Sequence, residues 1–265
     1  MRYDFKGRNI RGEEYDTLTD EMEVNQTEIS TLEWYDFVGL LADIIPALHL
    51  GGTKATEDLL ETFQLGPKTR VLDIGCGGGQ TACKIAREYS SQVVGIDISD
   101  VMISKAKEKA RAQNVEDKVE FRVADVFQLP FDDGSFDVAL FESVLTPLPG
   151  NKLDAMNETI RVIKPGGLIG ANESIFYTSA PAELLELVDK HPAVPGGMFT
   201  PQKLTGLFEE SGLQVVKITD VRFGSPRRRQ GNGRTRDSIL HDKVLLENTV
   251  QVADRPPLQN GADGR

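Results

Sequence analysis

The feature that most constrains the fold is a regular alternation of short apolar runs and amphipathic stretches across residues 70–221. The apolar runs are rich in residues that favour strands, and the stretches between them carry apolar residues at helical spacing. Strands that alternate with single helices are joined by right-handed crossovers and run parallel. The pattern therefore predicts an α/β fold built on a doubly wound, mostly parallel sheet.

The caps and breaks of this alternation locate its elements along the chain. Ser99 and Asp100 are good N-caps for the helix after the second strand, and Asn114 is a plausible end for it. The Pro165-Gly166-Gly167 motif closes the helix before the fifth strand. The predicted strands are 70–74, 92–96, 119–123, 136–141, 168–172 and 213–221, and the predicted helices are 31–45, about 53–63, 80–89, 101–113, 153–163, 181–189 and 201–211.

A glycine-rich segment follows the first predicted strand and opens the next helix. Asp73, Gly75, Gly77 and Gly79 stand at alternate positions, and Gln80 follows them. Glycines let the backbone turn tightly here and let a ligand approach the main chain. In a doubly wound sheet, this edge is where a nucleotide-like ligand binds.

The spacing of these glycines separates two classes of cofactor. The dinucleotide fingerprint G-x-G-x-x-G/A, started at Gly75, requires Gly or Ala where Gln80 stands. The segment instead resembles motif I of class I methyltransferases that use S-adenosylmethionine, an acidic residue followed by x-Gly-x-Gly-x-Gly. This resemblance implies a Rossmann-like sheet of seven strands, or a six-stranded variant, with an N-terminal helical cap.

Other segments match the same family in the same order over residues 70–172. Asp97 ends the second strand, where a carboxylate can accept the ribose hydroxyls of a nucleoside, as it also does in NAD enzymes. Asp125 resembles the family's acid that reads the adenine amino group. Residues 136–142 and 163–167 are similar to the family's fourth strand and to the turn before its fifth. An NAD-dependent oxidoreductase is disfavoured by Gln80 and Asp125.

The resemblance implies S-adenosylmethionine as the cofactor and S-adenosylhomocysteine as its product. An acidic site suits the positive sulfonium. Upstream, residues 48–57 are similar to a segment of phosphoethanolamine and sarcosine-type N-methyltransferases, in which a Gly-Gly turn contacts the methionine end. The implied cofactor-binding residues are Gly51, Gly52, Asp73, Gly75, Cys76, Gly77, Gln80, Thr81, Asp97, Ile98, Met102, Asp125, Val126, Phe141 and Glu142.

Catalysis of methyl transfer requires the acceptor to be positioned and water to be excluded, and a general base only if the acceptor is protonated. The candidate bases are Glu142 and His191, with Tyr177 and Glu173 behind them. The alternatives are a solvated loop acid at Glu142 and a plain connector around His191. The expected organisation has three parts. Residues 1–52 form an N-terminal helical lid, in which Tyr15 or Tyr35 either covers the site or is a core aromatic. Residues 53–222 form a cofactor-binding domain with an acceptor-lid insertion at about 174–200, and residues 223–265 form a partly disordered basic loop and tail.

Charge and composition restrict the partners. The net charge of −11 disfavours nucleic acid, although residues 222–236 carry six arginines and no acid. We interpret that segment as a mobile surface loop, and a lid that meets an anionic substrate or partner is the alternative. Cys76, Cys83 and three scattered histidines show no metal-binding spacing. No apolar run reaches the roughly 18 residues that span a bilayer, and no signal peptide is visible, so we expect a cytoplasmic protein.

The leading functional hypothesis is a methyltransferase that acts on a small molecule. The alternatives are a methyltransferase acting on RNA or protein, and a non-catalytic protein that binds S-adenosylmethionine. The acceptor atom and the oligomeric state, including a homodimer, stay open because one fold supports many chemistries.

Overall fold

The computed structural model describes residues 2–3, 9–10, 52–176, 199–222 and 243–252. Within these ranges the chain forms a seven-stranded sheet in the order β5-β4-β3-β6-β7-β9-β8 and a separate two-stranded antiparallel pair. The pair consists of β1 (Arg2–Tyr3) and β2 (Asn9–Ile10). The strands of the main sheet are β3 (Arg70–Ile74), β4 (Gln92–Asp97), β5 (Val119–Val123), β6 (Phe136–Glu142), β7 (Ile163–Phe176), β8 (Leu213–Arg222) and β9 (Lys243–Val252).

The order of these strands distinguishes the sheet from that of dinucleotide-binding proteins. Five neighbouring strands, from β5 to β7, are parallel, whereas β9 runs antiparallel to both β7 and β8. A dinucleotide-binding doubly wound sheet has the strand order 3-2-1-4-5-6. Here the last of the described strands, β9, lies between β7 and β8, which take the fifth and sixth places of that order. The expected mostly parallel, Rossmann-like sheet of seven strands is confirmed.

Two parts of the sheet differ from the sequence-based prediction. Strand β9 lies in the segment that the sequence assigns to the basic loop and tail, so 243–252 are part of the sheet. Strand β7 begins at Ile163, because the Pro-Gly-Gly motif is accommodated inside the strand as an irregularity. The register passes from the pair Phe136 and Ile163 to the pair Val138 and Leu168, which leaves 164–167 opposite a single residue of β6. The predicted helices 31–45 and 181–189 lie outside the described residues.

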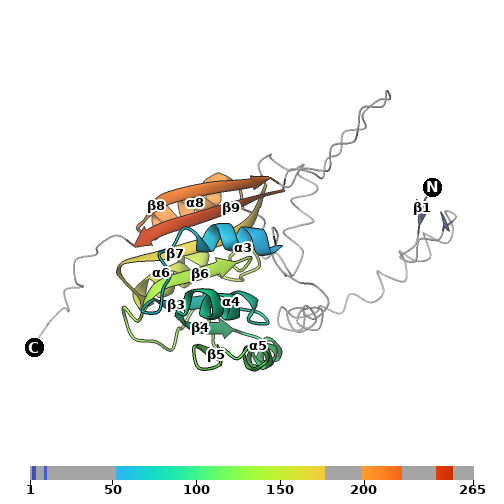
Figure 1. The fold of residues 1–265 in the computed structure, drawn as a ribbon. Helices are drawn as coiled ribbons and strands as arrows, with labels where there is room; N and C mark the ends of the chain where they lie inside the picture. Colours follow the sequence, from blue (N-terminus) through green and yellow to red (C-terminus); the bar gives the residue numbers. More distant parts are fainter. Residues whose placement is uncertain (1, 4–8, 11–51, 177–198, 223–242, 253–265) are drawn as a thin grey trace, which may run out of the picture.

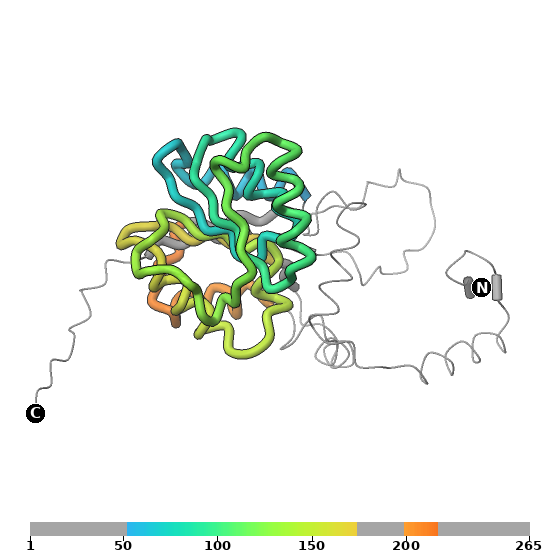
Figure 2. Tube along the Cα trace, turned by 90° about the horizontal axis from the view of Figure 1, so that it is seen from below, coloured from blue at the N-terminus to red at the C-terminus, as the bar shows by residue number. Residues whose placement is uncertain are grey.

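Helices cover both faces of the sheet (Figure 1), and each face has its own buried core. One core packs α6 and α8 through Met156 and Phe208, and the other packs α3, α4 and α5 through Leu59 and Ile85. In Figure 2 the segments coloured blue to green and those coloured yellow to orange lie at opposite sides of the domain, as the strand order requires. The helices are α3 (Gly52–Leu60), α4 (Gln80–Tyr89), α5 (Asp100–Ala112), α6 (Lys152–Val162) and α8 (Pro201–Glu210).

Side-chain caps determine where several of these helices begin. The Ser99 hydroxyl accepts a hydrogen bond from the Met102 backbone N–H at 3.2 Å, so the predicted cap of α5 is confirmed. The Asn151 side chain caps α6 in the same way. The cap at Ser99 follows directly on β4, so it also defines how the chain leaves the end of that strand.

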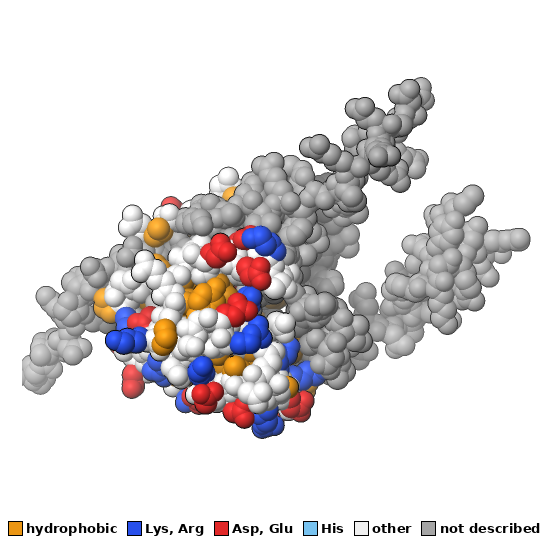
Figure 3. Space-filling view, in the orientation of Figure 1, with side chains coloured by type: hydrophobic (Ala, Val, Ile, Leu, Met, Phe, Trp, Pro, Cys, Tyr) orange, Lys and Arg blue, Asp and Glu red, His pale blue; other side chains and the backbone are white. Residues whose placement is uncertain are grey.

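The visible face of the domain carries acidic and basic side chains in mixture (Figure 3). On α4, Lys84 lies 3.2 Å from the Glu57 carboxylate and 2.9 Å from that of Glu88. The described helices include none that is long and apolar enough to cross a membrane. The arginine-rich segment at 222–236 lies almost wholly outside the described residues.

Candidate functional site

The glycine loop, residues 75–79, joins β3 to α4 with three glycines in the left-handed region, at φ values of +65°, +49° and +74°. The last of them, Gly79, is required by packing, because a Cβ there would lie 2.7 Å from Phe121 Cζ and 2.9 Å from Ala106 Cβ. At Gly77, in contrast, a Cβ would meet nothing within 4 Å. The backbone at Gly77 therefore faces open space, where a ligand can approach it.

Asp97 connects the glycine loop to the end of β4. One carboxylate oxygen accepts a hydrogen bond from the Gly77 N–H at 2.9 Å, and the other accepts one from the Ser99 N–H at 3.0 Å. These two donors fix the orientation of the carboxylate beside the open backbone of the loop. A carboxylate held in this way can still accept hydroxyl donors on its remaining lone pairs.

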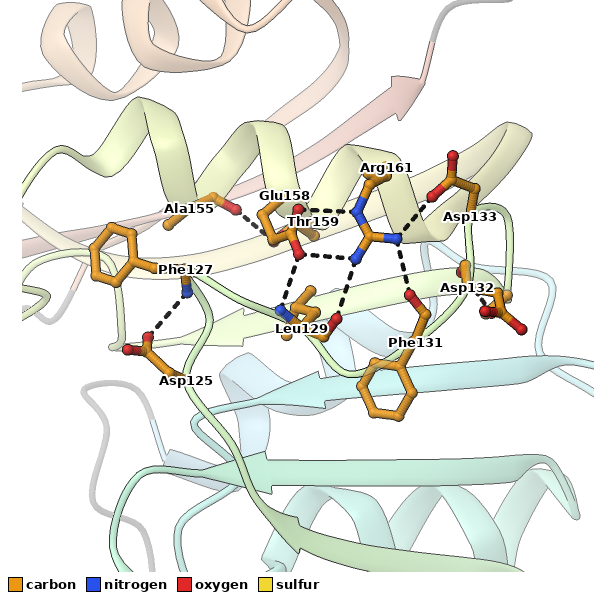
Figure 4. Close-up of polar contacts among 11 residues, drawn as sticks. Asp125, Phe127, Leu129, Phe131, Asp132, Asp133, Ala155, Glu158, Thr159 and Arg161 are labelled. Carbon is orange, nitrogen blue, oxygen red and sulfur yellow. Dashed lines mark hydrogen bonds and ion pairs between the residues drawn. The ribbon is translucent and has the colours of Figure 1, made fainter.

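The connection that follows β5 is fastened to α6 by an ion-pair network (Figure 4). Arg161 donates to the carbonyls of Phe131 at 2.8 Å and Leu129 at 3.1 Å, and to the Asp133 carboxylate at 2.7 Å. Glu158 accepts from the Leu129 N–H at 2.9 Å, and its hydrogen bond with Arg161 lowers its pKa. The network holds the segment that starts at the predicted adenine-reading acid.

That acid, Asp125, also has a local hydrogen bond. Its carboxylate accepts from the Phe127 N–H at 2.9 Å, while its backbone carbonyl accepts from the Gln128 N–H at 3.1 Å. The turn after β5 is thus closed by its own residues as well as by the Arg161 network.

Asp73 is a buried acid beneath the glycine loop, with 2% of its surface exposed. Burial raises its pKa well above the ordinary value, and the charges of Glu142 and Asp97 raise it further. A hydrogen bond with the Ala82 backbone lowers it in part. The second carboxylate oxygen, Oδ2, has no hydrogen-bond partner among the described residues. The Asp73 carboxyl therefore lies close enough to those of Asp97 and Glu142 for their charges to act on it.

Glu142 ends β6 on the same face of the sheet and contacts two helices. Its two carboxylate oxygens accept hydrogen bonds from the Thr56 hydroxyl of α3 at 2.8 Å and from the Thr81 hydroxyl of α4 at 2.5 Å. The side chain is half-buried. Glu142 therefore links α3 and α4 to the end of β6.

Beside Glu142 lie two buried polar groups that lack partners among the described residues: the Ser143 hydroxyl and the Asn172 amide. Their backbones are joined, since the Ser143 N–H donates to the Asn172 carbonyl at 2.8 Å. Asn172 is fully buried and pairs in register with Glu142 across β6 and β7. A buried polar atom without a partner is unfavourable by about 1–3 kcal/mol, so such atoms mark places where a ligand group or water completes the structure.

Glu173, the next residue of β7, is fully buried and receives four hydrogen bonds from the turn after β6. The donors are the N–H groups of Val144 at 2.8 Å, Leu145 at 2.7 Å and Thr146 at 3.1 Å, and the Thr146 hydroxyl at 2.7 Å. Burial raises the pKa of Glu173, and these donors offset part of that rise. The sequence offers Glu173 only as a reserve base and carries no local signal of this contact.

A profile of the methyltransferase domain family matches residues 65–212, which is more than half of the chain. The chain belongs to this methyltransferase family. It is 31% identical over 186 residues to 27-O-demethylrifamycin SV methyltransferase of Amycolatopsis mediterranei, a match that spans 69% of this chain and 68% of that relative. The expected family, enzyme class and cofactor, S-adenosylmethionine, are confirmed.

Two solved structures share the fold of this methyltransferase. The [4+2]-cyclase SpnF superposes with a TM-score of 0.68 at 20% identity, over 85% of this chain and 97% of that one. Geranyl diphosphate C-methyltransferase from Streptomyces coelicolor, solved with S-adenosyl-L-homocysteine, gives 0.60 at 17% identity over 75% and 76%. At these identities the likeness shows the fold alone, and the cyclase shows that the fold by itself does not specify methyl transfer.

The remaining predicted site residues of the methyltransferase fall into three groups. Gly52 begins α3 and Gln80 begins α4, while Ile98, just beyond β4, is 51% exposed. Gly51, His191, Tyr177, Tyr15 and Tyr35 lie outside the described residues. Those that the structure buries are Cys76, Thr81, Met102, Val126 and Phe141. Among the described residues no group of three or more His, Cys, Asp or Glu could hold a metal ion.

Proposed function

We propose that this methyltransferase transfers the methyl group of S-adenosylmethionine to a small-molecule acceptor at the carboxyl ends of β3, β4 and β6. The observation that carries the proposal is the acidic site of Asp73, Asp97 and Glu142 around a glycine loop that is open at Gly77. S-adenosylmethionine brings a sulfonium and an ammonium, and both are attracted to fixed negative charge in a partly buried site. The relative from Amycolatopsis is named for a small-molecule acceptor, which supports the same class here.

Each part of the cofactor has a matching group in the chain. The oriented carboxylate of Asp97 is proposed to accept the ribose hydroxyls, and the unpartnered oxygen of Asp73 to face the amino-acid end. The half-exposed Ile98 offers an apolar contact to the adenine ring, and Asp125 offers an acceptor to its amino group. The cofactor supplies an electrophilic methyl group, and the protein binds both reactants and excludes water from them.

Glu142 and His191 remain the proposed catalytic candidates. Both carboxylate oxygens of Glu142 already accept hydrogen bonds from the hydroxyls of Thr56 and Thr81, and this supports a role for Glu142 in holding the cofactor. The unpartnered groups of Ser143 and Asn172 are proposed to complete polar contacts on the acceptor side. The lid over the acceptor is proposed to come from segments outside the described residues.

The ribose contact is tested by Asp97→Ala, with the exposed Asp117→Ala as a matched control. Loss of a charge-assisted hydrogen bond should weaken the binding of S-adenosylhomocysteine by about 1–3 kcal/mol in calorimetry, whereas the control should bind as the wild type does. Unchanged affinity in the Asp97 variant would remove that contact from the proposal. A wild-type protein stabilised against heat by NADH, and not by S-adenosylmethionine or its product, would overturn the function itself.

The class of acceptor is tested by methyl labelling. Protein incubated with S-adenosylmethionine carrying a radioactive methyl group is supplied in parallel with a metabolite extract, total RNA and unfolded protein. We expect label in the small-molecule fraction alone. Label in RNA or protein would favour a macromolecular acceptor, and cofactor binding without any label would favour a non-catalytic role. A homodimer stays a prediction, which light scattering of the purified chain can check.

A further inference from the structure

We propose that Glu173 is a positioning residue that presses the turn at 143–146 against the glycine loop and thereby sets the affinity for the cofactor. The proposal rests on the proposed function, because it assigns a role to a residue that would contact neither reactant. Glu173 is remote from the cofactor motifs in sequence, and it would act entirely through the turn that it holds.

The first step is the contact between Glu173 and the turn. Each carboxylate oxygen accepts two hydrogen bonds: Oε1 from the N–H groups of Val144 and Leu145, and Oε2 from the N–H and hydroxyl of Thr146. Three successive backbone N–H groups thus converge on one side chain. Because these donors leave the carboxylate saturated, it is poorly suited to remove a proton from an acceptor.

The second step is the strain of the turn that these bonds maintain. Ser143, which is not a glycine, has a φ of +57°, a conformation that persists only where surrounding contacts impose it. Its N–H donates to the Asn172 carbonyl, so the end of β7 holds the turn from its first residue to Thr146. The turn is therefore set by β7 and not by its own sequence.

The third step is the contact between the turn and the glycine loop. A Cβ at Gly75 would lie only 2.5 Å from Val144 Cγ2 and 3.3 Å from Val144 Cγ1. Val144 thus fills the space directly above the first glycine of the loop. An outward shift of the turn would remove the contact between Val144 and Gly75 and would leave the glycine loop freer to move. Because the cofactor binds a loop of fixed geometry, its affinity should then fall. Glu173, Val144 and Gly75 form a continuous path from β7 to the cofactor loop.

The charge of Glu173 fits this role. A buried carboxylate is costly unless its oxygens are fully hydrogen-bonded, and four donors meet that condition here. The Lys152 ammonium is near enough for the two charges to interact, and it donates a hydrogen bond to the Leu148 carbonyl. The charge of Glu173 thus serves mainly to collect the backbone donors of one turn.

The experiment measures the binding of S-adenosylhomocysteine by calorimetry to a series of variants of the full chain. Glu173→Gln keeps the shape of the side chain but replaces one accepting oxygen with an NH₂ group, which faces two of the four hydrogen-bond donors. We expect about tenfold weaker binding of S-adenosylhomocysteine. Thr146→Val removes only the hydroxyl donor and should fall between this variant and wild type. Val144→Ala removes the contact with Gly75 and should also weaken binding several-fold.

The double variant Glu173→Gln with Val144→Ala decides whether one residue acts through the other. If Glu173 acts through Val144, the double variant should bind S-adenosylhomocysteine no more weakly than the single variant with the lower affinity, because both changes remove the same contact. Thr159→Val is the control, since the buried Thr159 hydroxyl donates to the Ala155 carbonyl within α6 and should leave cofactor affinity unchanged.

Two results would overturn the inference: folded Glu173→Gln protein that binds within twofold of wild type, or losses that multiply in the double variant. If Glu173→Gln protein does not fold, Thr146→Val and Val144→Ala still decide the matter, because both should weaken binding. Failure of the proposed function looks different, since the wild type itself would then not bind the cofactor product.

Discussion

The sheet edge where the parallel strands end has two halves, and they differ in the sequence separation between hydrogen-bonded residues. In the half formed by β3, β4 and β5, named the cofactor half for its proposed ribose and adenine contacts, Asp97 accepts hydrogen bonds from residues 2 and 20 positions away. In the half formed by β6 and β7, named the acceptor half for the proposed acceptor contacts of Ser143 and Asn172, Glu142 accepts from residues 61 and 86 positions away. Glu173 reaches back 27 to 29 positions to the turn after β6.

This difference shows how each half obtains its geometry. The Asp97 contacts span few positions of the chain, so they form once β3 and β4 pair and the glycine loop leads into α4. The acceptor half depends on contacts among α3, α4, β6 and β7, which exist only once the whole sheet has assembled. Its polar groups should therefore contribute more to global stability, and the following variants test that expectation.

The largest effect is expected from Glu173→Ala. The change leaves three backbone N–H groups and one hydroxyl without a partner in a buried turn, and it should lower the free energy of unfolding by about 3–5 kcal/mol. Asp97→Ala, its counterpart in the half-exposed cofactor half, should lose about 1 kcal/mol. Urea denaturation of the cofactor-free variants measures both, and equal losses would contradict the comparison.

A smaller loss of stability is expected from Gly79→Ala, within the cofactor half. The new Cβ would clash with Phe121 and Ala106 and would force a left-handed conformation, so we expect a loss of about 2–4 kcal/mol. Gly77→Ala is the matched variant: its φ is also positive, but its Cβ meets nothing, and the loss should stay near 1 kcal/mol. Because that methyl group projects where the cofactor would approach, Gly77→Ala should instead weaken binding. A Gly77 variant with normal affinity would mean that the ligand lies elsewhere.

The same contrast explains what could be predicted from the sequence. Asp73, the alternating glycines and Asp97 are separated by fixed short spacings, so the parallel strands around them follow from local pattern, and their proposed roles rest on the same pattern. Ser99 was predictable as the cap of α5 for the same reason, since capping depends on residues within one turn.

The other features of the fold and the site depend on contacts between distant segments, so no single segment of the sequence predicts them. Strand β9 follows an arginine-rich stretch, and its pairing with β7 and β8 exists only in the assembled sheet, so its place between those strands does not follow from its own residues. The Pro-Gly-Gly motif predicts a break in the chain, but in the structure it lies within β7, and a shift of register between β6 and β7 accommodates it. Glu173 reads as a candidate base because sequence does not show that its oxygens are already occupied by the turn.

An effect of opposite sign is expected from Asp73→Asn. Removing a buried acid whose ionisation is opposed by burial and by the charges of Glu142 and Asp97 should stabilise the cofactor-free protein by about 1–2 kcal/mol, while cofactor binding weakens. Because the folded-state pKa of Asp73 is raised, the native state holds its proton above the ordinary carboxyl pKa of about 4. Wild-type stability relative to Asp73→Asn should therefore fall as pH rises from that value through the raised pKa. Melting temperatures of both proteins across pH check this, and a constant difference would contradict a buried, titrating Asp73.

The smallest effect is expected from Arg161→Ala, which removes the network that fastens the turn after β5 to α6. Arg161 is partly exposed, with 32% of its side-chain surface accessible, so its ion pairs with Asp133 and Glu158 are worth little, and water can replace its bonds to two carbonyls. We expect a loss of about 1 kcal/mol in urea denaturation. Affinity for S-adenosylhomocysteine should hardly change, because Asp125 keeps its own local hydrogen bonds. A loss of affinity as large as that of Glu173→Gln would show that the Arg161 network also positions the cofactor site, and the expectation that Asp125 is held by its local hydrogen bonds would be wrong.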